Sequence, residues 1–343
     1  MSNVTFTTIN LFNYLEPPNA FYEFENIYTC EEWAKKQSWF RDKLSVIDAD
    51  IIGFQEVFSP NSLKQLVAEC GFPYFEVIEQ PKSESDYLFF SPVVAIASKY
   101  PITAATPVTV DDHLLDAFNF SSGFTFSRSP IHATVELPHL GATDIYVVHF
   151  KSQRATEVDA PYLHSKTHLP THSYKPSDSL SLLHEEQMGR WLSTVQRGLE
   201  VNLLHRYISA QRDKTRQPVV LMGDFNKPLS SDEFNGLLSF ELFRNEDSRH
   251  WLSEFRLRDS WDLYHQLHSN DLLEQRPPTH YYGAKGSTLD YILFSNEFDC
   301  QCDRNIMEVS HYSVIDKHIV NPSFEHDQFS TDHALVSVTT SLR

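Results

Sequence analysis

The sequence is short of cysteine, of basic residues and of long apolar runs, and each shortage excludes a class of protein. Four cysteines among 343 residues are too few for the disulfide framework of a small secreted domain, so we expect free thiols. No window approaches the roughly 18 apolar residues of a membrane-spanning helix. The N-terminal segment has no basic stretch followed by an apolar one, so no secretory signal is indicated. These absences predict a soluble, cytoplasmic protein with no membrane span.

Basic residues are outnumbered by acidic ones, 28 against 46, which gives a formal net charge of −18. Proteins that grip long duplexes by neutralising many phosphates usually carry a basic face, so the charge argues against tight, non-specific duplex binding. A phosphate-containing substrate is still compatible with it. A bound divalent cation inverts the local field, and a small basic cluster at a cleft can guide an anion.

Hydrophobic residues make up 41% of the chain and aromatic residues 13%, which is enough for a large core. Although the length would allow two domains, we expect one domain over residues 1–343. Apolar residues near a 3.6-residue spacing predict helices over 31–49, 59–71, 180–212 and 232–243. Strand-like runs cover 4–9, 50–55, 74–78, 88–97, 102–110, 131–137, 144–148, 219–222, 279–282, 289–294 and 334–338.

The order of these runs predicts an α/β protein with two packed sheets and helices outside them. Turn residues separate the strand-like runs between 74 and 148, which we interpret as an antiparallel meander. On the long helix at 180–212, arginines alternate with acidic residues, a pattern typical of a solvated helical face. The arginines are Arg190, Arg197, Arg206 and Arg212.

Residues 152–179 have no periodicity and contain several prolines, so we expect a long surface loop inserted into the domain. His164, His168 and His172 recur every four residues within it, as zinc ligands on a helix would. Prolines on both sides oppose a continuous helix. The loop also holds basic residues, and a basic rim beside a cleft is the favoured alternative to a metal site.

Two polar motifs border buried strands. Gly223-Asp224-Phe225-Asn226 follows the apolar run 219–222, and Ser330-Thr331-Asp332-His333 precedes the final apolar run. Carboxylates, an amide and a histidine are groups that hold a hard divalent cation and move a proton. A single Asp or Asn after a strand is more often a turn residue, so neither motif is decisive alone. Further polar residues at strand ends are Asn10, Glu56, His149, Lys151 and Asp290.

In sequence order, four motifs resemble those of the endonuclease/exonuclease/phosphatase superfamily. They are Gln55-Glu56, Gly223-Asp224-Phe225-Asn226, the segment Ser287-Thr288-Leu289-Asp290-Tyr291-Ile292 and Ser330-Thr331-Asp332-His333. The resemblance extends over residues 5–338. The members of this superfamily are similar to DNase I, the abasic-site endonucleases, the inositol polyphosphate 5-phosphatases and the bacterial sphingomyelinases. It implies a four-layered α/β sandwich, with two mostly antiparallel sheets flanked by helices.

The resemblance also implies a role for each polar residue. Asn10, Glu56 and Asp332 match metal-binding positions, for Mg²⁺ with Mn²⁺ or Ca²⁺ as alternatives, and amide and carboxylate oxygens suit such ions. Asp224 matches the residue that orients or deprotonates the attacking water. His333 matches the catalytic histidine, and Asp290 matches the carboxylate that orients its ring.

The remaining matches concern the substrate phosphate. Asn226 would position it, and His149 would donate to one of its oxygens or protonate the leaving oxygen. The wording around His149-Phe150-Lys151-Ser152 and Arg128 is most similar to bacterial nucleases of the superfamily. Lys151 and Arg128 are therefore candidates for phosphate binding, since a guanidinium can engage two oxygens. A plain surface arginine in a turn is an equally good interpretation of Arg128.

The predicted function is metal-dependent hydrolysis of a phosphodiester by in-line attack of water, with a nuclease as the first choice. The expected partner is a nucleic acid or nucleotide, short, single-stranded or bound at its end. Phosphomonoesterase and phospholipid or sphingomyelin phosphodiesterase are the alternatives within the superfamily. Thr288-Leu289-Asp290 stands where nucleases often have Arg-Ile-Asp, which removes one phosphate contact. A catalytically silent binding module is the rival from another class. The sequence indicates no oligomeric state.

Overall fold

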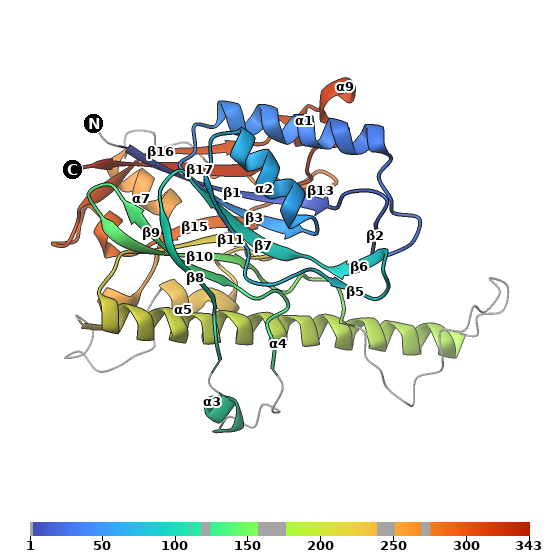
Figure 1. The fold of residues 1–343 in the computed structure, drawn as a ribbon. Helices are drawn as coiled ribbons and strands as arrows, with labels where there is room; N and C mark the ends of the chain where they lie inside the picture. Colours follow the sequence, from blue (N-terminus) through green and yellow to red (C-terminus); the bar gives the residue numbers. More distant parts are fainter. Residues whose placement is uncertain (1–2, 111, 118–123, 157–175, 239–250, 269–274) are drawn as a thin grey trace.

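Two six-stranded sheets lie face to face between two layers of helices in the computed structural model (Figure 1). The structure describes residues 1–343 except 1–2, 111, 118–123, 157–175, 239–250 and 269–274. Helices α1 and α2 cover the outer face of the first sheet, and the long helix α4 runs along the outer face of the second (Figure 1). The four-layered sandwich predicted from the sequence is confirmed.

The first sheet has the strand order β16–β17–β1–β3–β7–β4 and the second β12–β15–β11–β10–β9–β8. Strands of the first sheet are β16 Met307–Ile315, β17 Leu335–Leu342, β1 Asn3–Tyr14, β3 Ile51–Val57, β7 Val93–Ser98 and β4 Tyr74–Glu76. Strands of the second are β12 Arg258–Asp259, β15 Asp290–Phe294, β11 Val219–Asp224, β10 Gly141–His149, β9 Ile131–Leu137 and β8 Ile102–Pro107. Two small sheets consist of β2 Ala20–Phe21, β6 Leu88–Ser91 and β5 Lys82–Ser83, and of β13 His280–Tyr282 and β14 Lys285–Ser287.

The described helices range from one turn to eleven. They are α1 Cys30–Val46, α2 Pro60–Glu69, α3 Asp112–Ala117, α4 Pro176–Thr215, α5 Asn235–Leu238, α7 Ser260–Leu267, α8 Lys317–Val320 and α9 Phe324–Asp327. Short 3₁₀ helices are η1 Asp232–Phe234, η2 Ser253–Phe255 and η3 Asn296–Phe298. In the described part of the chain, none of these helices combines the length and the apolar character that crossing a bilayer requires.

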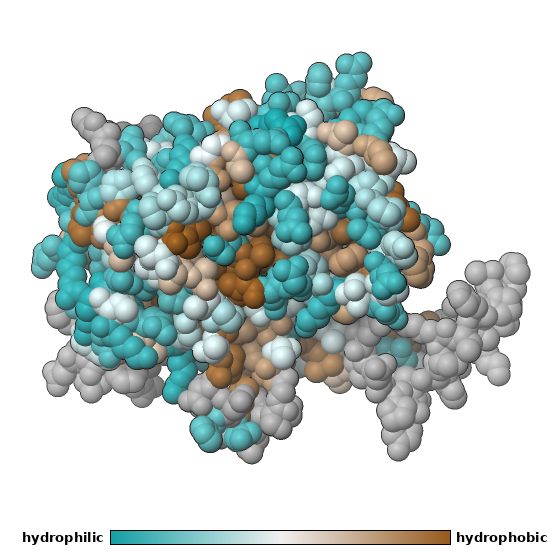
Figure 2. Space-filling view, viewed as in Figure 1, coloured by the Kyte–Doolittle hydropathy of each residue, from teal (hydrophilic) through white to brown (hydrophobic). Residues whose placement is uncertain are grey.

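Side-chain alternation along the central strands builds three apolar layers. Met222 on β11 points into the core between the sheets, whereas its neighbour Leu221 packs toward α4. On β3, Ile51 joins the core between the sheets and Ile52 the core under α1 and α2. Both sheets are therefore buried on both faces over their central strands. The face of the molecule in Figure 2 is largely hydrophilic, with apolar residues in small groups.

Helix α1 begins at a capping box, in which Thr29 and Glu32 bond each other's backbone N–H groups. The helix then buries Trp33, Phe40 and Leu44 against the first sheet. A fully buried lysine, Lys36, lies on the same face and donates to the backbone carbonyl of Ser330 at 3.1 Å. The helix thus fixes the chain just before the Ser330–His333 motif.

Each large sheet has one parallel pair at its centre, β1 with β3 and β10 with β11, and its other pairings are antiparallel. Parallel neighbours bring their carboxyl ends to the same edge of a sheet. That edge is where ligands bind in α/β sheets. The polar residues singled out in the sequence lie at this edge.

Three expectations about secondary structure are wrong. The strand-like runs between 74 and 148 do not form one meander, because β4 and β7 belong to the first sheet, β8, β9 and β10 to the second, and β5 and β6 to a small third sheet. The single run at 88–97 is two strands of different sheets, with Pro92 between them. Helix α4 begins at Pro176, inside the expected loop 152–179. His164, His168 and His172 lie outside the described residues.

The arginines of α4 are not all solvated as predicted. Arg197 and Arg212 are buried and pair with Glu233 and Glu297, each at 2.9 Å. Both partners come from segments distant in sequence, so the pattern on the helix alone did not indicate them.

Candidate active site

Five strands of the two large sheets bring the predicted polar residues together. In the second sheet, His149 is the register partner of Asp224 across β10 and β11, and Asp224 is the partner of Asp290 across β11 and β15. In the first sheet, Asn10 faces Gln55, the residue before Glu56, across β1 and β3. The register of the sheets therefore fixes the spacing of these side chains.

Gly223 is required for this alignment. A Cβ at this position would lie 2.0 Å from the carbonyl oxygen of Val148, and the residue has φ +148°. Only glycine lets β11 approach the end of β10 so closely. Asp224 follows directly, and its backbone carbonyl accepts from Phe150 N–H at 3.0 Å. The glycine of the motif thus has a structural cause.

One carboxylate oxygen, Asp224 Oδ2, lies at the centre of the site. His149 Nε2 is 3.4 Å from it and His333 Nε2 is 4.0 Å from it. The amide Nδ2 of Asn10 donates to the same oxygen at 3.2 Å, from the other sheet. Two imidazoles and an amide thus converge on one acceptor that is almost fully buried.

His333 is held from its other ring nitrogen. Its Nδ1 lies 2.9 Å from Asp290 Oδ2, and the same oxygen accepts from the hydroxyl of Thr279 at 2.6 Å. The Thr279 hydroxyl in turn accepts from two backbone N–H groups, those of Leu289 and Asp290. This chain of contacts fixes the ring of His333 with its Nε2 toward Asp224. Thr279 was not identified from the sequence.

The two histidines of the site differ in charge. Burial lowers the pKa of His149 well below its ordinary value, and the nearby charges of Arg128 and His333 lower it further. Burial alone would also lower the pKa of His333, but the negative charges of Asp290 and Asp224 outweigh it and raise that pKa well above its ordinary value. At neutral pH, His149 is therefore neutral and His333 is a cation.

The pKa of Asp224 is shifted upward. Burial raises the pKa of Asp224, with Asp290 and Glu56 adding to the shift, while His333 and the Asn226 N–H oppose it. A carboxylate whose pKa is raised toward neutrality can accept a proton more readily than an exposed one. The buried group next to a cationic imidazole has the properties of a base.

The edge of the first sheet offers oxygen ligands. Asn10 Nδ2 donates to Glu56 Oε1 at 3.4 Å, and Glu56 Oε2 accepts from Asn13 N–H at 2.9 Å. Glu56 has φ +60°, and the pairings of β3 with β1 and with β7 shift register at this point, so a bulge turns its side chain toward the site. Irregular backbone of this kind is frequent next to active sites.

Asp332 is the third predicted metal ligand. Its Oδ1 is buried and has no hydrogen-bond partner among the described residues. A buried carboxylate oxygen without a partner is costly, and a bound cation would satisfy it. The oxygens of Asn10, Glu56 and Asp332 are the donor types that Mg²⁺ and Ca²⁺ prefer. The residues present therefore fit a hard divalent cation.

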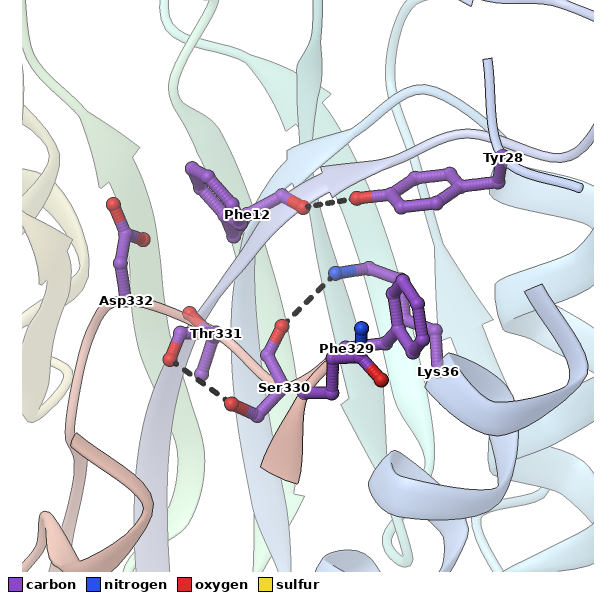
Figure 3. Close-up of a pocket in the computed structure, with 8 residues that line it drawn as sticks. Phe12, Tyr28, Lys36, Phe329, Ser330, Thr331 and Asp332 are labelled. Carbon is purple, nitrogen blue, oxygen red and sulfur yellow. Dashed lines mark hydrogen bonds between the residues drawn. The ribbon is translucent and has the colours of Figure 1, made fainter. Parts of the chain in front are cut away.

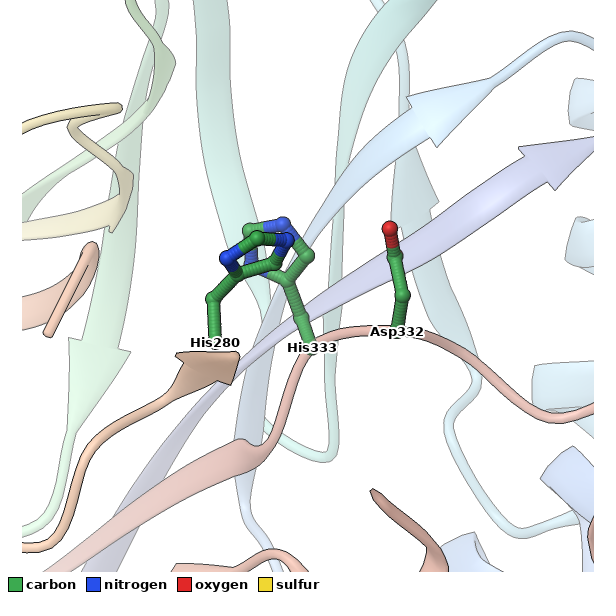
Figure 4. A group of neighbouring side chains, drawn as sticks. All are labelled: His280, Asp332 and His333. Atoms are coloured by element: carbon green, nitrogen blue, oxygen red, sulfur yellow. The ribbon is translucent and has the colours of Figure 1, made fainter. Parts of the chain in front are cut away.

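His280 is a neighbour that the sequence did not reveal. It pairs with His333 through an isolated β-bridge, and the two ring centroids are 5.0 Å apart (Figure 4). Asp332 stands beside this pair, and the three side chains offer ligand atoms within 4.8 Å of one another (Figure 4). A second such group consists of Asp224, Asp290 and His333. No motif in the sequence marks His280, which is the first residue of the three-residue strand β13.

Asn226 and the predicted phosphate-binding residues lie at one side of the site. The Asn226 side chain donates to Phe150 O at 2.9 Å, and its N–H donates to Asp224 Oδ1 at 2.8 Å. The charge of Arg128 affects the pKa values of both His149 and Lys151, which places this arginine near the cluster. Burial, with Arg128 adding to it, lowers the pKa of Lys151.

Glu200 on α4 binds the backbone of the segments that carry Arg128 and Lys151. Its carboxylate accepts from the backbone N–H of Ser127 and from that of Lys151, both at 2.7 Å. It thereby joins the segments that carry Arg128 and Lys151. The sequence pattern had placed Glu200 on a solvated face, but it is 1% exposed.

Comparisons with known proteins bear on the family and the fold. The family model described as Endonuclease/Exonuclease/phosphatase family matches residues 26–333. No curated protein matches the chain. The catalytic domain of human Nocturnin with bound sulfate is similar in structure, with a TM-score of 0.58, 16% identity, and 99% of this chain and 95% of that chain covered.

Two further structures give the same result. The endonuclease/exonuclease/phosphatase from Bacteroides vulgatus has a TM-score of 0.55 and 13% identity over the whole of both chains. ANGEL2, described as a 2′,3′-cyclic phosphatase, has a TM-score of 0.54 and 13% identity over 98% of this chain and 95% of that chain. At these identities the neighbours show the fold, and the family model shows the membership. Members of this family are phosphoric ester hydrolases that generally depend on a divalent metal. The chain belongs to the endonuclease/exonuclease/phosphatase family.

Proposed function

We propose that the chain is a divalent-metal-dependent phosphodiesterase of the nuclease type, acting as one catalytic domain. The observation that carries this proposal is the convergence of His149, His333 and the Asn10 amide on Asp224 Oδ2. A base, a cation and hydrogen-bond donors around one point are the groups that hydrolysis of a phosphodiester by water requires.

Asp224 is the proposed base. It holds the attacking water and accepts its proton as the new P–O bond forms and the bond to the leaving oxygen breaks. The leaving alkoxide takes a proton from the surrounding water, so the products are an alcohol and a phosphomonoester. The raised pKa of Asp224 favours this transfer near neutral pH.

The two histidines contact the phosphoryl group from either side of Asp224. His333, held as a cation by Asp290, stabilises negative charge that develops on the phosphoryl oxygens. His149 is neutral and donates a hydrogen bond to another phosphoryl oxygen. Each of these contacts contributes about 2–4 kcal/mol to stabilisation of the transition state. Asn226 and Arg128 orient the phosphate.

Asn10, Glu56 and Asp332 are the proposed metal ligands. A divalent ion bound there supplies positive charge that offsets the charge on the phosphoryl and leaving oxygens. Mg²⁺ is the first choice, because carboxylate and amide oxygens with water suit it. Mn²⁺ and Ca²⁺ suit the same ligands.

The site has a single cationic imidazole and few basic residues. This favours phosphodiesters over phosphomonoesters as substrates. A phosphomonoester dianion carries more negative charge than a diester, and the surrounding carboxylates repel it. The overall charge of −18 also argues against long duplexes. A short or single-stranded nucleic acid, or a nucleotide diester, fits these conditions.

Hydrolysis of bis-p-nitrophenyl phosphate with Mg²⁺, Mn²⁺ or Ca²⁺, and with EDTA, tests the proposal. We expect metal-dependent release of p-nitrophenol that exceeds the release from p-nitrophenyl phosphate and that disappears in Asp224→Ala. A substrate panel then includes single-stranded DNA and RNA, sphingomyelin and a 2′,3′-cyclic nucleotide, the last because ANGEL2 is described as a cyclic phosphatase. Hydrolysis of p-nitrophenyl phosphate alone would favour a phosphomonoesterase, and no metal-dependent hydrolysis of diesters, monoesters or nucleic acid would favour a silent binding module.

A further inference from the structure

A pocket opens beside the proposed metal ligands, and apart from Asp332 its lining residues have no part in the scheme above. Its volume is about 270 Å³, and three aromatic side chains line it, those of Phe12, Tyr28 and Phe329 (Figure 3). Asp332 lies at its edge (Figure 3). Pockets for drug-sized ligands usually measure roughly 300–1,000 Å³, so this one is suited to a single ring system.

The backbone holds Phe12 at the mouth of this pocket. Phe12 has φ +50° and Asn13 φ +54°, a left-handed conformation that bulky residues rarely adopt. The Phe12 N–H donates to Asn10 Oδ1 at 3.0 Å, and its carbonyl accepts from the Tyr28 hydroxyl at 3.5 Å. As a result the ring of Phe12 is 40% exposed, although it is two residues from a proposed metal ligand. An exposed aromatic ring in a strained conformation next to a site points to a contact with the substrate.

Amino groups of the protein already lie close to these rings, and one of them, that of Lys36, itself lines the pocket (Figure 3). Lys36 Nζ lies 5.7 Å from the centroid of Phe12 and 5.4 Å from that of Tyr28. Lys35 Nζ lies 6.0 Å from the centroid of Phe329. A quaternary ammonium group such as choline is bound by the same ring faces, so the internal amines compete with it. A flat, uncharged ring is not repelled by these amino groups and can stack on the aromatic side chains instead.

We propose that this pocket is a subsite for a nucleobase next to the scissile phosphate. The inference rests on the proposed phosphodiesterase function and deepens it, because it assigns the substrate to nucleoside phosphodiesters. Aromatic platforms of this kind bind bases through stacking, and stacking tolerates different sequences. A base in the pocket would be joined through its sugar to a phosphate near Asp332 and His333.

Affinity measurements separate this subsite from the chemistry. Isothermal titration calorimetry of the Mg²⁺-loaded chain compares 3′- and 5′-thymidine monophosphate with methyl phosphate, phenyl phosphate and phosphocholine. We expect at least one thymidine monophosphate to bind about 5- to 100-fold more tightly than methyl phosphate, the range that base stacking on an aromatic ring supplies. Phe329→Ala and Phe12→Leu should each reduce this ratio by about fivefold or more.

Phe324→Ala is the matched control. Phe324 lies on α9 close to Phe329 in sequence, is 81% exposed and does not line the pocket. This variant should keep the wild-type ratio. A ratio near one in the wild type, or a ratio that survives in both pocket variants, would overturn the subsite. Tighter binding of phosphocholine would assign the pocket to a phospholipid head group, and equal binding of phenyl phosphate would assign it to aryl groups in general.

Hydrolysis of methyl p-nitrophenyl phosphate distinguishes the two proposals. If the wild type hydrolyses this diester but shows no preference for thymidine monophosphate, the nucleobase subsite is wrong and the phosphodiesterase stands. If the preference is found without any diester hydrolysis, the phosphodiesterase is wrong and the pocket is a nucleotide-binding site.

Discussion

The two sheets reach the site through the same backbone arrangement, a central parallel pair, but they end in different chemistry. The pair β1 and β3 presents an amide and a carboxylate, Asn10 and Glu56. The pair β10 and β11 presents a histidine and an aspartate, His149 and Asp224. The first sheet contributes hard oxygen ligands, and the second contributes groups whose pKa values burial has moved. We infer that one sheet supplies charge to the reaction and the other moves its proton.

The largest effect should come from the proton-transfer side. Asp224→Asn keeps the shape and the hydrogen bond from Asn10 but removes the base, so kcat for a diester should fall about 10²–10⁴-fold. Excess Mg²⁺ should not restore it. The measurement is steady-state hydrolysis of methyl p-nitrophenyl phosphate over a range of metal concentrations. Activity within tenfold of the wild type would show that Asp224 is not the base.

The same variant should not lose stability. Because burial raises the pKa of Asp224, the folded protein binds this proton more tightly than the unfolded chain. Above the unfolded pKa of about 3.9, the buried carboxylate therefore lowers the free energy of unfolding, increasingly as the pH rises toward the folded pKa. Asp224→Asn should show a Tm at pH 7.5 equal to or above that of the wild type. A lower Tm would indicate a structural role.

The second prediction concerns the charge of His333. Asp290→Asn removes the partner that raises the pKa of His333, so the imidazolium should be lost at lower pH. The sign follows from the direction of the shift: a raised pKa keeps the cation present below that pKa, and the cation is lost as the pH rises through it. We expect kcat/KM to fall about 10²-fold and the alkaline limb of its pH profile to move to lower pH. An unchanged alkaline limb would show that His333 is not the titrating group.

Substitution of a proposed metal ligand should lower the affinity for Mg²⁺ more than it lowers kcat at saturating metal. Glu56→Gln should weaken the apparent affinity for Mg²⁺ by about tenfold or more, because it replaces a carboxylate ligand by an amide. High Mg²⁺ should restore most of the rate, in contrast to Asp224→Asn. The measurement is a metal titration of the EDTA-stripped chain. Equal metal affinity in Glu56→Gln and the wild type would place the ion elsewhere, for example at His280, Asp332 and His333.

The sequence predicted the parts of the molecule that depend on strand ends. Asp224, Asp290 and His333 border buried apolar runs, and register alone then brings the first two side by side. Periodicity could not show where the chain changes sheet. Residues 88–97 are apolar except for Ser91, but Pro92 cannot donate to a ladder, and the chain passes there from a small sheet into a large one.

Residues that act through distant partners were not predictable. Glu200 and Arg197 are one turn apart on α4 and look like part of a solvated pattern, but the packing of α4 on the second sheet buries both. Lys36 is likewise part of an amphipathic helix, and only the fold brings its amino group to Ser330. Thr279 and His280 lie next to His333 because β13 bridges the last motif. Tertiary packing decides each of these roles.

The smallest effect should come from the residue that links the two phosphate-binding segments. The N–H groups of Ser127 and Lys151 bind different oxygens of Glu200, so Glu200→Gln keeps an acceptor for only one of them and removes the negative charge. The segments that carry Arg128 and Lys151 should lose their fixed spacing. We expect KM for a diester to rise about three- to tenfold, equivalent to about 0.7–1.4 kcal/mol of binding, with little change in kcat.

A second glutamate on the same helix gives the control for this prediction. Glu186 is exposed and forms a surface pair with Arg190, so Glu186→Gln should leave KM and Tm unchanged. In Glu200→Gln, a fall of kcat with unchanged KM would assign Glu200 to the proton-transfer groups. A rise of KM with unchanged kcat would instead confirm that Glu200 on α4 affects substrate binding, whereas Asp224 on the second sheet affects proton transfer.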